Sequence, residues 1–413
     1  MNSDRFLRDN AAWLGAGILL TFSSSVGQTF FIALFAEPLR TKFLLSHGEW
    51  GGLYTTATFC SAATLLIIGR SADVLRVRTL AMITYGGLIG LAIAMANVNS
   101  VIMLTVIIYG LRLCGQGMMT HIAITAMARW FARRRGRAVA IAGLGVTFGE
   151  GFIPVLAVSL IAFIGWRETW LAAAMLLAVV LVPTVFYLLR HERKPGEDDG
   201  SHSHVGMQGR HWTRAQVLKH WFFWALTPGM IIPPFTTTAL FFHQAHVVSV
   251  KGWLLSDYVL TFPVFSGCVL LFSFISGMAI DRFGGLRILP FYLLPIATSL
   301  LVLGLAEPLW MAYLYMGMLG MTSGVGGTLL GTLWAEMYGT KNLGGIRALA
   351  VAVMVLGTGL GPGVMGALID WGVSIETQCF WMAAYTFAMS VVFIFVARKI
   401  SGERLETIAM ESS

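Results

Sequence analysis

Two stretches of the chain follow one pattern: GRSADVLRVR at residues 69–78 and GMAIDRFGGLR at residues 277–287. Each stretch has a glycine, an aspartate four residues later and then basic residues, and each follows a long apolar segment. An acid among basic residues at a membrane edge is costly to place unless it is paired. The two stretches begin 208 residues apart. This spacing indicates a duplicated membrane unit, which is how many transporters are built.

The composition places the chain in a membrane. Of its 413 residues, 57% are hydrophobic and only 12% are charged, whereas a soluble domain carries about 25% charged residues. The four cysteines lie in or beside apolar segments without CxxC spacing, so we expect packing residues, no disulfide framework and no metal site. The first apolar stretch, about 25 residues, is longer than the apolar core of a signal peptide, so we expect no cleavable leader.

Twelve segments are apolar and long enough to cross a bilayer as helices, which takes about 20 residues each. We therefore predict an all-α integral membrane protein with twelve transmembrane helices in two six-helix repeats. The predicted domains are an N-terminal bundle over residues 1–189, a cytoplasmic linker over 190–219 and a C-terminal bundle with a short tail over 220–413. The predicted spans are 12–36, 50–70, 78–96, 100–128, 138–160, 169–189, 220–247, 256–278, 286–305, 308–335, 344–370 and 377–397.

The distribution of Lys and Arg sets the orientation. An even number of spans puts both termini on one side, where the tails and loops hold 23 of the 28 basic residues, and the opposite loops hold four. Because basic loops stay in the cytoplasm, we predict a multi-pass cell-membrane protein, of the bacterial inner membrane, with both termini cytoplasmic. The net charge of +8 is then a topology signal, and we expect no nucleic-acid partner.

A glycine-rich segment also occurs in both halves. Span five carries GVTFGEG at residues 145–151, and span eleven carries GTGLGPG at residues 357–363. Glycines four residues apart let membrane helices approach closely, so we assign helix packing to Gly145, Gly149, Gly361 and Pro362. Packing does not explain Glu150, which stands where the second copy has Pro362.

These motifs resemble those of the major facilitator superfamily over nearly the whole chain. The family's loop motif is G-x-x-x-D-R-x-G-R, and the second copy matches it through Gly277, Asp281, Arg282, Gly284 and Arg287. RWFARRRGRA at residues 129–138 resembles the family's loop after span four, and GWR at residues 165–167 resembles its turn before span six. The nearest branch is that of oxalate and monocarboxylate porters, although spans eight and eleven lack the basic residue that this branch often places there.

The first copy of the loop motif departs from the family pattern at Val74 and Arg76, where Arg and Gly are usual; its motif residues are Gly69, Asp73, Arg76 and Arg78. The resemblance implies that Asp73 closes a cytoplasmic gate by facing the backbone at residues 344–346 and one of the arginines at 133–135. A carboxylate at a helix N-terminus gains about 0.3–1 kcal/mol. That gain would be present only when the cytoplasmic side is closed.

Two formally charged side chains fall in the middle of predicted spans: Arg112 in span four and Glu150 in span five. A lone charge at this depth costs at least about 2.5–3.5 kcal/mol. The two spans are consecutive and antiparallel, so one interpretation is a static salt bridge that holds the N-terminal bundle together. The other is functional: Glu150 takes up and releases a proton, and Arg112 binds an anion or alternates between Glu150 and the substrate.

Other polar side chains are expected to line a central cavity, because the resemblance places spans one, four, seven and ten at the centre. We assign substrate or coupling roles to Gln28, Thr237, His243 and Gln244. The last three follow Pro233-Pro234, which we expect to break span seven. His243 lies near the outer end of that span, where a gate and an interfacial histidine are both open interpretations.

The sequence favours a secondary active transporter that works by alternating access and moves a small organic solute, of which a carboxylate is one candidate, in symport with protons. An alternative is proton-driven export of amphipathic compounds, and a remoter one is a membrane sensor that does not transport. No HExxH, GxSxG or phosphate-binding loop occurs, so we expect no enzyme activity and no cofactor. The expected partners are a small-molecule substrate, protons and the bilayer, and we expect a monomer.

Overall fold

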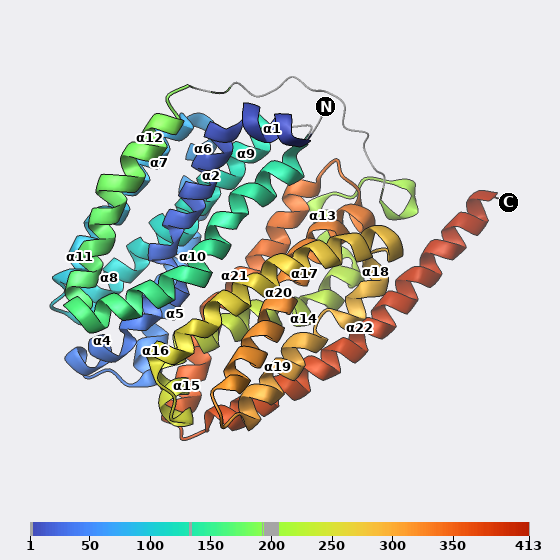
Figure 1. Cartoon of the computed structure of the whole chain (residues 1–413). Coiled ribbons are helices and arrows are strands. Elements are labelled where there is room, and N and C mark those ends of the chain that lie inside the picture. The colour runs from blue at the N-terminus through green and yellow to red at the C-terminus, as the bar shows by residue number, and fades with distance from the viewer. Residues whose placement is uncertain (1–2, 132–133, 192, 194–205, 413) are drawn as a thin grey trace. The chain divides into compact units, whose positions relative to one another are not determined.

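The computed structural model describes residues 3–131, 134–191, 193 and 206–412 (Figure 1). Within these residues every regular element is helical. The chain forms two compact units: Met1–Ser201 with Phe241–His246, and His202–Leu240 with Val247–Ser413. Ten of the described helices or helix runs are long and apolar enough to cross a membrane, and one bent pair makes an eleventh. The prediction of an all-α membrane protein is confirmed.

The first unit holds six of these spans, counting the bent pair. The bent pair is formed by α2 (Ala11–Ser23) with η1 (Ser24–Gly27) and by α3 (Thr29–Ile32), η2 (Ala33–Phe35) and α4 (Ala36–Phe43). The other five are α5 (His47–Ile68), α7 (Val77–Ala96), α8–η3–α9 (Val101–Leu111, Arg112–Met119, Thr120–Trp130), α10 (Arg135–Ile164) and α11–η5–α12 (Trp166–Met175, Leu176–Leu181, Val182–Leu188). Short helices α1 (Ser3–Asp9) and α6 (Ser71–Val74) complete it.

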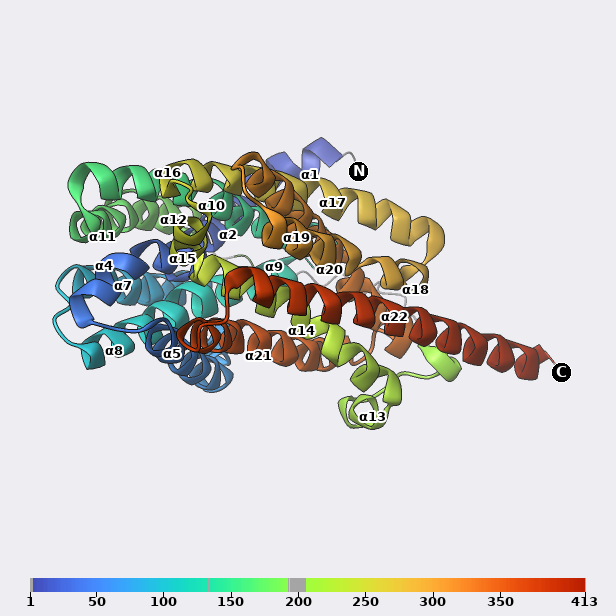
Figure 2. The same ribbon diagram turned by 90° about the horizontal axis from the view of Figure 1, so that it is seen from below.

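The second unit also has six long helices among the described residues. They are α14 (Trp221–Phe242), α16–η7–α17 (Leu255–Tyr258, Val259–Thr261, Phe262–Phe283), α18–η8–α19 (Gly285–Ile288, Leu289–Phe291, Leu294–Leu305), α20 (Trp310–Tyr338), α21 (Leu343–Asp370) and α22 (Ile375–Ser412). Figure 2 shows α22 as a long continuous helix that ends at the C-terminus. The last two residues of α14 group with the first unit.

Helix α20 differs from the other predicted spans. It is 29 residues long, which gives about 44 Å at 1.5 Å per residue, but it is not among the helices that are apolar enough to cross a membrane. Its six glycines and several hydroxyl residues lower its hydropathy. The glycines have a packing reason: a Cβ on Gly320 would lie 2.3 Å from the Phe265 carbonyl oxygen, and one on Gly324 would lie 2.4 Å from that of Val269. α20 therefore packs against α17 at backbone contact.

The first span is broken, which the sequence analysis did not predict. η1 ends at Gly27, Gln28 is extended (φ −84°, ψ 154°), and the two halves are bent by 41°. Serine hydroxyls at the break bond to the preceding turn: Ser23 Oγ donates to the Leu19 carbonyl (2.7 Å) and Ser24 Oγ to that of Thr21 (2.6 Å). Such local bonds compete with regular helix geometry.

The prediction that Pro233-Pro234 breaks span seven is wrong. Helix α14 runs without interruption through Pro228, Pro233 and Pro234. The helix ends instead at Phe242, and α15 (Gln244–Lys251) begins after His243. Membrane helices tolerate proline where neighbouring groups satisfy the freed carbonyls. The break therefore falls about ten residues later than expected.

Matching close contacts occur in the two units. In α10, a Cβ on Gly145 would lie 2.0 Å from the Ile18 carbonyl oxygen of α2, and one on Gly149 would lie 2.0 Å from Ser25 Oγ. In α21, a Cβ on Gly361 would lie 2.5 Å from the Phe235 carbonyl oxygen of α14. Pro362 lies buried inside α21, beside Gly361. Glycine is required at these crossings because the backbones touch.

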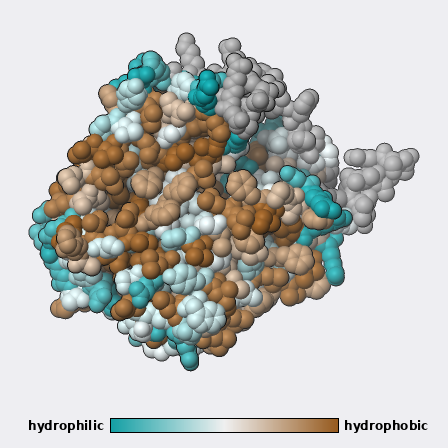
Figure 3. Space-filling view, viewed as in Figure 1, coloured by the Kyte–Doolittle hydropathy of each residue, from teal (hydrophilic) through white to brown (hydrophobic). Residues whose placement is uncertain are grey.

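The outward faces of the spans are apolar. Large side chains such as Phe163 (87% exposed), Leu66 (81%) and Phe274 (74%) project from the helices, and hydrophobic residues cover much of the visible surface in Figure 3. A soluble protein rarely exposes apolar patches of such extent. These faces are suited to contact with lipid.

The end of the predicted linker packs on the second unit. Its helix α13 (Arg214–Lys219) starts with a capping box formed by Thr213 and Gln216, and Val217 is fully buried. The Trp212 amide donates to the Tyr338 carbonyl (3.1 Å), and Asn342 Nδ2 donates to the Trp212 carbonyl (2.9 Å). Residues 192 and 194–205 of the predicted linker lie outside the described residues.

Candidate substrate and coupling site

Arg112 lies at the point where span four changes its helical winding. It opens the π-helical segment η3, which joins α8 to α9, and only 2% of its surface is exposed. Its Nη1 lies 3.4 Å from the Gly27 carbonyl oxygen and 3.4 Å from Thr29 Oγ1. Both acceptors flank the break in span one. π-Helical turns occur often at functional sites, and broken membrane helices often mark the binding sites of transporters.

Two glycines bring the broken span against this π-helical segment. A Cβ on Gly27 would lie 2.1 Å from the Leu111 carbonyl oxygen, and one on Gly115 would lie 2.6 Å from the Gly27 Cα. The close approach sets the last carbonyl of the half-helix η1 against the guanidinium. A helix C-terminus carries partial negative charge, so the backbone offsets part of the cost of burying Arg112.

Tyr54 of α5 forms a wall of the same site. The Arg112 guanidinium carbon lies 5.0 Å from the centre of the Tyr54 ring, within the range of a cation–π interaction. The Tyr54 hydroxyl and Thr29 Oγ1 share a 2.6 Å hydrogen bond in which either can be the donor. Tyr54 also packs against Phe242, which in turn stacks on Trp50 at 5.3 Å.

The positive charge of Arg112 has no carboxylate partner within the residues that the structure describes. Its hydrogen bonds reach only a backbone carbonyl and a hydroxyl, and its Nε has no partner. A buried cation is normally paired with an anion. Arg112 is therefore suited to bind a negatively charged group that is not part of the chain.

Glu150 lies near the middle of α10 and is half-buried. It follows Gly149, which contacts Ser25 of η1, and the buried Ser25 hydroxyl has no hydrogen-bond partner. In the described part of the chain Glu150 forms no ion pair, so the static salt bridge with Arg112 is not present in this structure. The functional interpretation of the two charges stays open.

The structure places the other predicted cavity residues in different surroundings. Gln28 Nε2 donates to Ser24 Oγ (3.3 Å) at the break in span one. Gln244 is fully buried; its Nε2 donates to the Phe30 carbonyl (3.3 Å), while its Oε1 has no partner. His243 is 2% exposed, with its ring 5.9 Å from that of His47. Gln28 thus lies at the break of the span that carries the Arg112 acceptors, and Gln244 of α15 contacts the same span through Phe30. Thr237 is half-buried and belongs to the second unit.

The first loop motif is described in part. Gly69 ends α5, and its carbonyl lies 3.0 Å from His121 Nε2. Arg76 is the N-cap of α7, and Arg78 stacks on Phe186 at 3.4 Å. The Asp73 side chain lies outside the described residues, so its predicted gate contact stays a prediction.

The second loop motif forms a helix end. Gly284 follows the last residue of α17 at φ +82°, a conformation that favours glycine, and the amide of the next residue donates to Glu336 Oε2 (3.3 Å). Arg282 stacks on its neighbour Phe283. Asp281 and Arg287 are exposed, and Gly277 lies in α17 near Thr328.

The sequence analysis missed Thr29 and Tyr54. Trp50 and Tyr54 are four residues apart in one span and so share a helix face. That pattern gave a signal for Tyr54, because amphipathic aromatic side chains four residues apart stand out in an apolar helix. Thr29 gave none, since its role depends on a break that hydropathy does not register.

The fold and this buried site define a multi-pass membrane transporter. The Major Facilitator Superfamily model matches residues 17–270, and the chain belongs to this family. It is therefore a transporter of small molecules and not an enzyme. The predictions of a membrane-embedded transporter and of its superfamily are confirmed.

Solved structures of the same fold are distant in sequence. A bacterial homologue of the human lysosomal transporter Spinster, in an inward-facing and occupied conformation, is 16% identical with a TM-score of 0.69, over 98% of this chain and 99% of that one. A mutant of the nucleoside transporter NupG is 13% identical with a TM-score of 0.70, over 93% and 99%. No curated protein sequence matches significantly. These structures support the fold alone.

Proposed function

We propose that this chain is a secondary active transporter that moves a small organic carboxylate in symport with protons. The observation that carries the proposal is the Arg112 guanidinium, buried at a broken membrane span without a carboxylate partner among the described residues. Both termini would be cytoplasmic, the two predicted bundles would alternate access to the site, and the protein would act as a monomer.

Arg112 is suited to hold a carboxylate. Its present contacts are long and reach neutral oxygens, whereas a carboxylate would accept short, charge-assisted and bidentate bonds from the same fork. The Tyr54 ring covers one side of the guanidinium, and both side chains are buried. Binding of an anion would neutralise a charge that costs at least about 2.5–3.5 kcal/mol in the middle of a membrane.

Glu150 is the proposed coupling group. A carboxyl group in the middle of a span is easiest to accommodate in its neutral, protonated form. When Glu150 holds a proton and Arg112 holds a carboxylate, Glu150 is neutral and Arg112 is part of a neutral ion pair. The loaded site then contains no unpaired charge. This supports symport, in which proton and anion cross together.

The first test is proton flux in proteoliposomes that contain a pH dye. Small carboxylates, sugars, lipophilic cations and nucleosides are offered in turn, the last because one protein of similar fold is a nucleoside transporter. We expect proton entry with a small carboxylate only. Proton entry with a neutral solute and none with any acid would overturn the substrate assignment.

The coupling role has its own variants. Glu150→Gln should abolish accumulation driven by a pH gradient and spare exchange of substrate across the membrane. The matched control is Glu307→Gln, which removes an exposed carboxylate at the start of the loop before α20. Undiminished uphill uptake by Glu150→Gln would remove this residue from the mechanism.

One observation favours the alternative of export of amphipathic compounds. The first unit has an apolar cavity of about 230 Å³ lined mainly by aliphatic and aromatic side chains from α2, α3, α10, α11 and η5, among them Phe22, Phe31 and Leu156. Such a lining suits an amphipathic solute. Proton exchange with lipophilic cations that persists in Arg112→Gln would support this function instead.

A further inference from the structure

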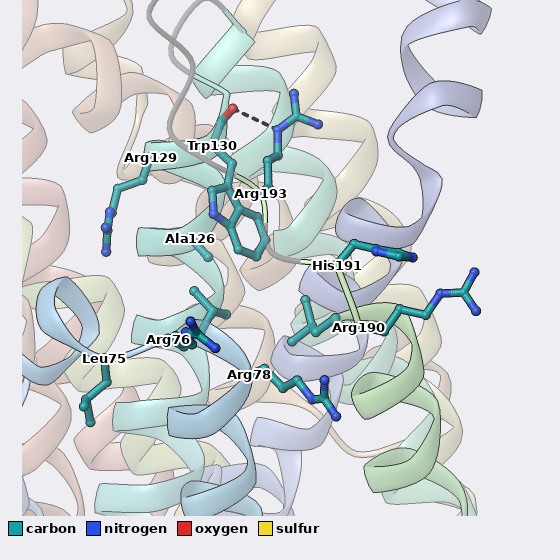
Figure 4. Close-up of a pocket in the computed structure, with 11 residues that line it drawn as sticks. Leu75, Arg76, Arg78, Ala126, Arg129, Trp130, Arg190, His191 and Arg193 are labelled. Atoms are coloured by element: carbon teal, nitrogen blue, oxygen red, sulfur yellow. Dashed lines mark hydrogen bonds between the residues drawn. The ribbon is translucent and has the colours of Figure 1, made fainter.

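Three separate segments of the first unit converge on a basic cavity of about 390 Å³ (Figure 4). They are the loop that enters α7, the end of α9 and the chain that leaves α12. Figure 4 shows the Trp130 ring among the basic side chains, with Arg129, Arg76 and Arg193 around it. The basic residues that line the cavity are Arg76, Arg78, Arg129, Arg190, His191 and Arg193.

The cavity lies where three membrane spans end. Val77 is the first residue of α7, Trp130 is the last of α9, and Leu189 follows α12 directly. Trp130 at such a position is typical of the level of lipid headgroups. A group bound here would therefore sit at the boundary between membrane and water.

Hydrogen bonds and ring stacking hold two of the lining arginines, Arg193 and Arg129, in place. Arg193 Nε donates to the Trp130 carbonyl (3.3 Å), as the dashed line in Figure 4 shows, and its guanidinium stacks on Phe131 at 4.3 Å. Arg129 Nη1 donates to the Ala72 carbonyl (2.8 Å). These hydrogen bonds position the two side chains, and their acceptors are backbone carbonyls, which do not neutralise the positive charge of the cavity.

Two guanidinium groups are held by stacking alone. Arg78 lies 3.4 Å from the centre of the Phe186 ring, and Arg190 lies 4.3 Å from that of Tyr187. In the described part of the chain neither guanidinium makes a hydrogen bond or an ion pair. None of the described lining residues is acidic. Stacking orients a guanidinium while leaving its edge N–H groups available to an acceptor.

Basic loops at one membrane face are expected from topology alone. Topology does not require them to come from three segments or to surround a cavity, and it does not require aromatic rings to orient the Arg78 and Arg190 guanidinium groups. We propose that this cavity binds a phosphate-bearing anion, and that its occupant is the headgroup of an anionic phospholipid. Arginine forks match phosphate oxygens in pairs, and clustered basic residues beside membrane spans attract anionic lipids.

The test measures binding by thermal unfolding of the full-length protein in detergent. Wild type is titrated with phosphatidylglycerol, with phosphatidylcholine and, separately, with glycerol phosphate in water. The test variant is Arg78→Gln/Arg190→Gln. The control is Arg8→Gln/Arg70→Gln, which removes two exposed positive charges from the same unit outside the cavity. Gel filtration and far-UV circular dichroism check that each variant is folded.

We expect phosphatidylglycerol to stabilise wild type and the control, phosphatidylcholine to have little effect, and the test variant to bind about tenfold or more weakly because two charge-assisted contacts are lost. If glycerol phosphate shifts the unfolding temperature as much as phosphatidylglycerol does, the cavity binds phosphate but its occupant is a soluble compound. That result would overturn the lipid assignment. An equal loss in both double variants, or no shift with any phosphate compound, would overturn the proposal. Should the test variant fail to fold, Arg190→Gln alone, at an exposed position, replaces it.

Discussion

At the level of single residues, the candidate site depends on Arg112, whose side chain is held in place by its neighbours in the first unit. Arg112 is buried because Gly27 and Gly115 allow the broken span to approach it and because Tyr54 covers its guanidinium. Each of these contacts involves a neutral group, so the guanidinium keeps its full charge. A buried charge without an ionic partner is expensive, and proteins keep such groups where function needs them.

The Tyr54 hydroxyl should tune this site. Tyr54→Phe keeps the ring and removes the hydrogen bond to Thr29, which also contacts Arg112. One hydrogen bond of about 0.5–1.5 kcal/mol corresponds to roughly a twofold to tenfold rise in the substrate KM, with kcat nearly unchanged. The control is Tyr109→Phe, which removes a similar tyrosine–threonine bond to Thr64 elsewhere in the unit. Equal effects of the two variants on KM would contradict the assignment.

At the level of elements, hydropathy predicts spans well and their irregularities poorly. The predicted spans 78–96 and 344–370 match α7 and α21 almost to the residue, because runs of apolar residues are all that a membrane helix requires. The break at Gln28 and the π-helical segment η3 depend on backbone contacts between distant residues, so hydropathy cannot show them. The serines before Gln28 were a sequence signal for the break, through their bonds to the preceding turn.

Close helix crossings provide a matched stability test. Gly145→Ala would place a methyl group 2.0 Å from the Ile18 carbonyl oxygen, and we expect it to destabilise the first unit by about 1–3 kcal/mol or more. Gly143→Ala, two residues earlier in α10, meets nothing within 4 Å and should be neutral or stabilising by up to about 1 kcal/mol. Thermal unfolding in detergent measures both, and similar midpoints for the two variants would show that α10 does not cross α2 here.

An ion pair joins two elements of the second unit. Lys251 Nζ at the end of α15 lies 2.8 Å from Glu376 Oε1 in the first turn of α22, with side chains 7% and 29% exposed. Lys251→Met should cost roughly 1–3 kcal/mol, between the values for exposed and buried pairs. Adding Glu376→Gln should recover part of that loss, and a fully additive double variant would mean that the pair is not coupled.

At the level of the whole molecule, the repeat is the feature that the sequence predicted best. The duplicated loop motif and the paired glycine segments indicated two related halves, and the family match and the fold bear out the superfamily. The pairing of charges could not be predicted, since neighbouring positions on consecutive helices do not fix which way each side chain points. Arg112 and Glu150 were found by their depth alone, and the residues around Arg112 required the structure.

The orientation of the chain is a further whole-molecule prediction. The test uses a reporter protein that is active only in the cytoplasm. If both termini are cytoplasmic, this reporter should be active when it is fused after Ser413. The same reporter placed in the loop at residues 97–100, between α7 and α8, should be inactive. The reverse pattern would contradict the orientation and the reading of the basic loops.

The central claim is that a substrate carboxylate supplies the negative charge that Arg112 lacks. The most direct measurement compares uptake of a transported acid with uptake of its neutral amide, in wild type and in Arg112→Gln, in proteoliposomes. The account predicts that wild type transports the acid and discriminates strongly against the amide, and that Arg112→Gln loses this discrimination along with transport of the acid. Equal preference for the acid in both proteins would contradict it.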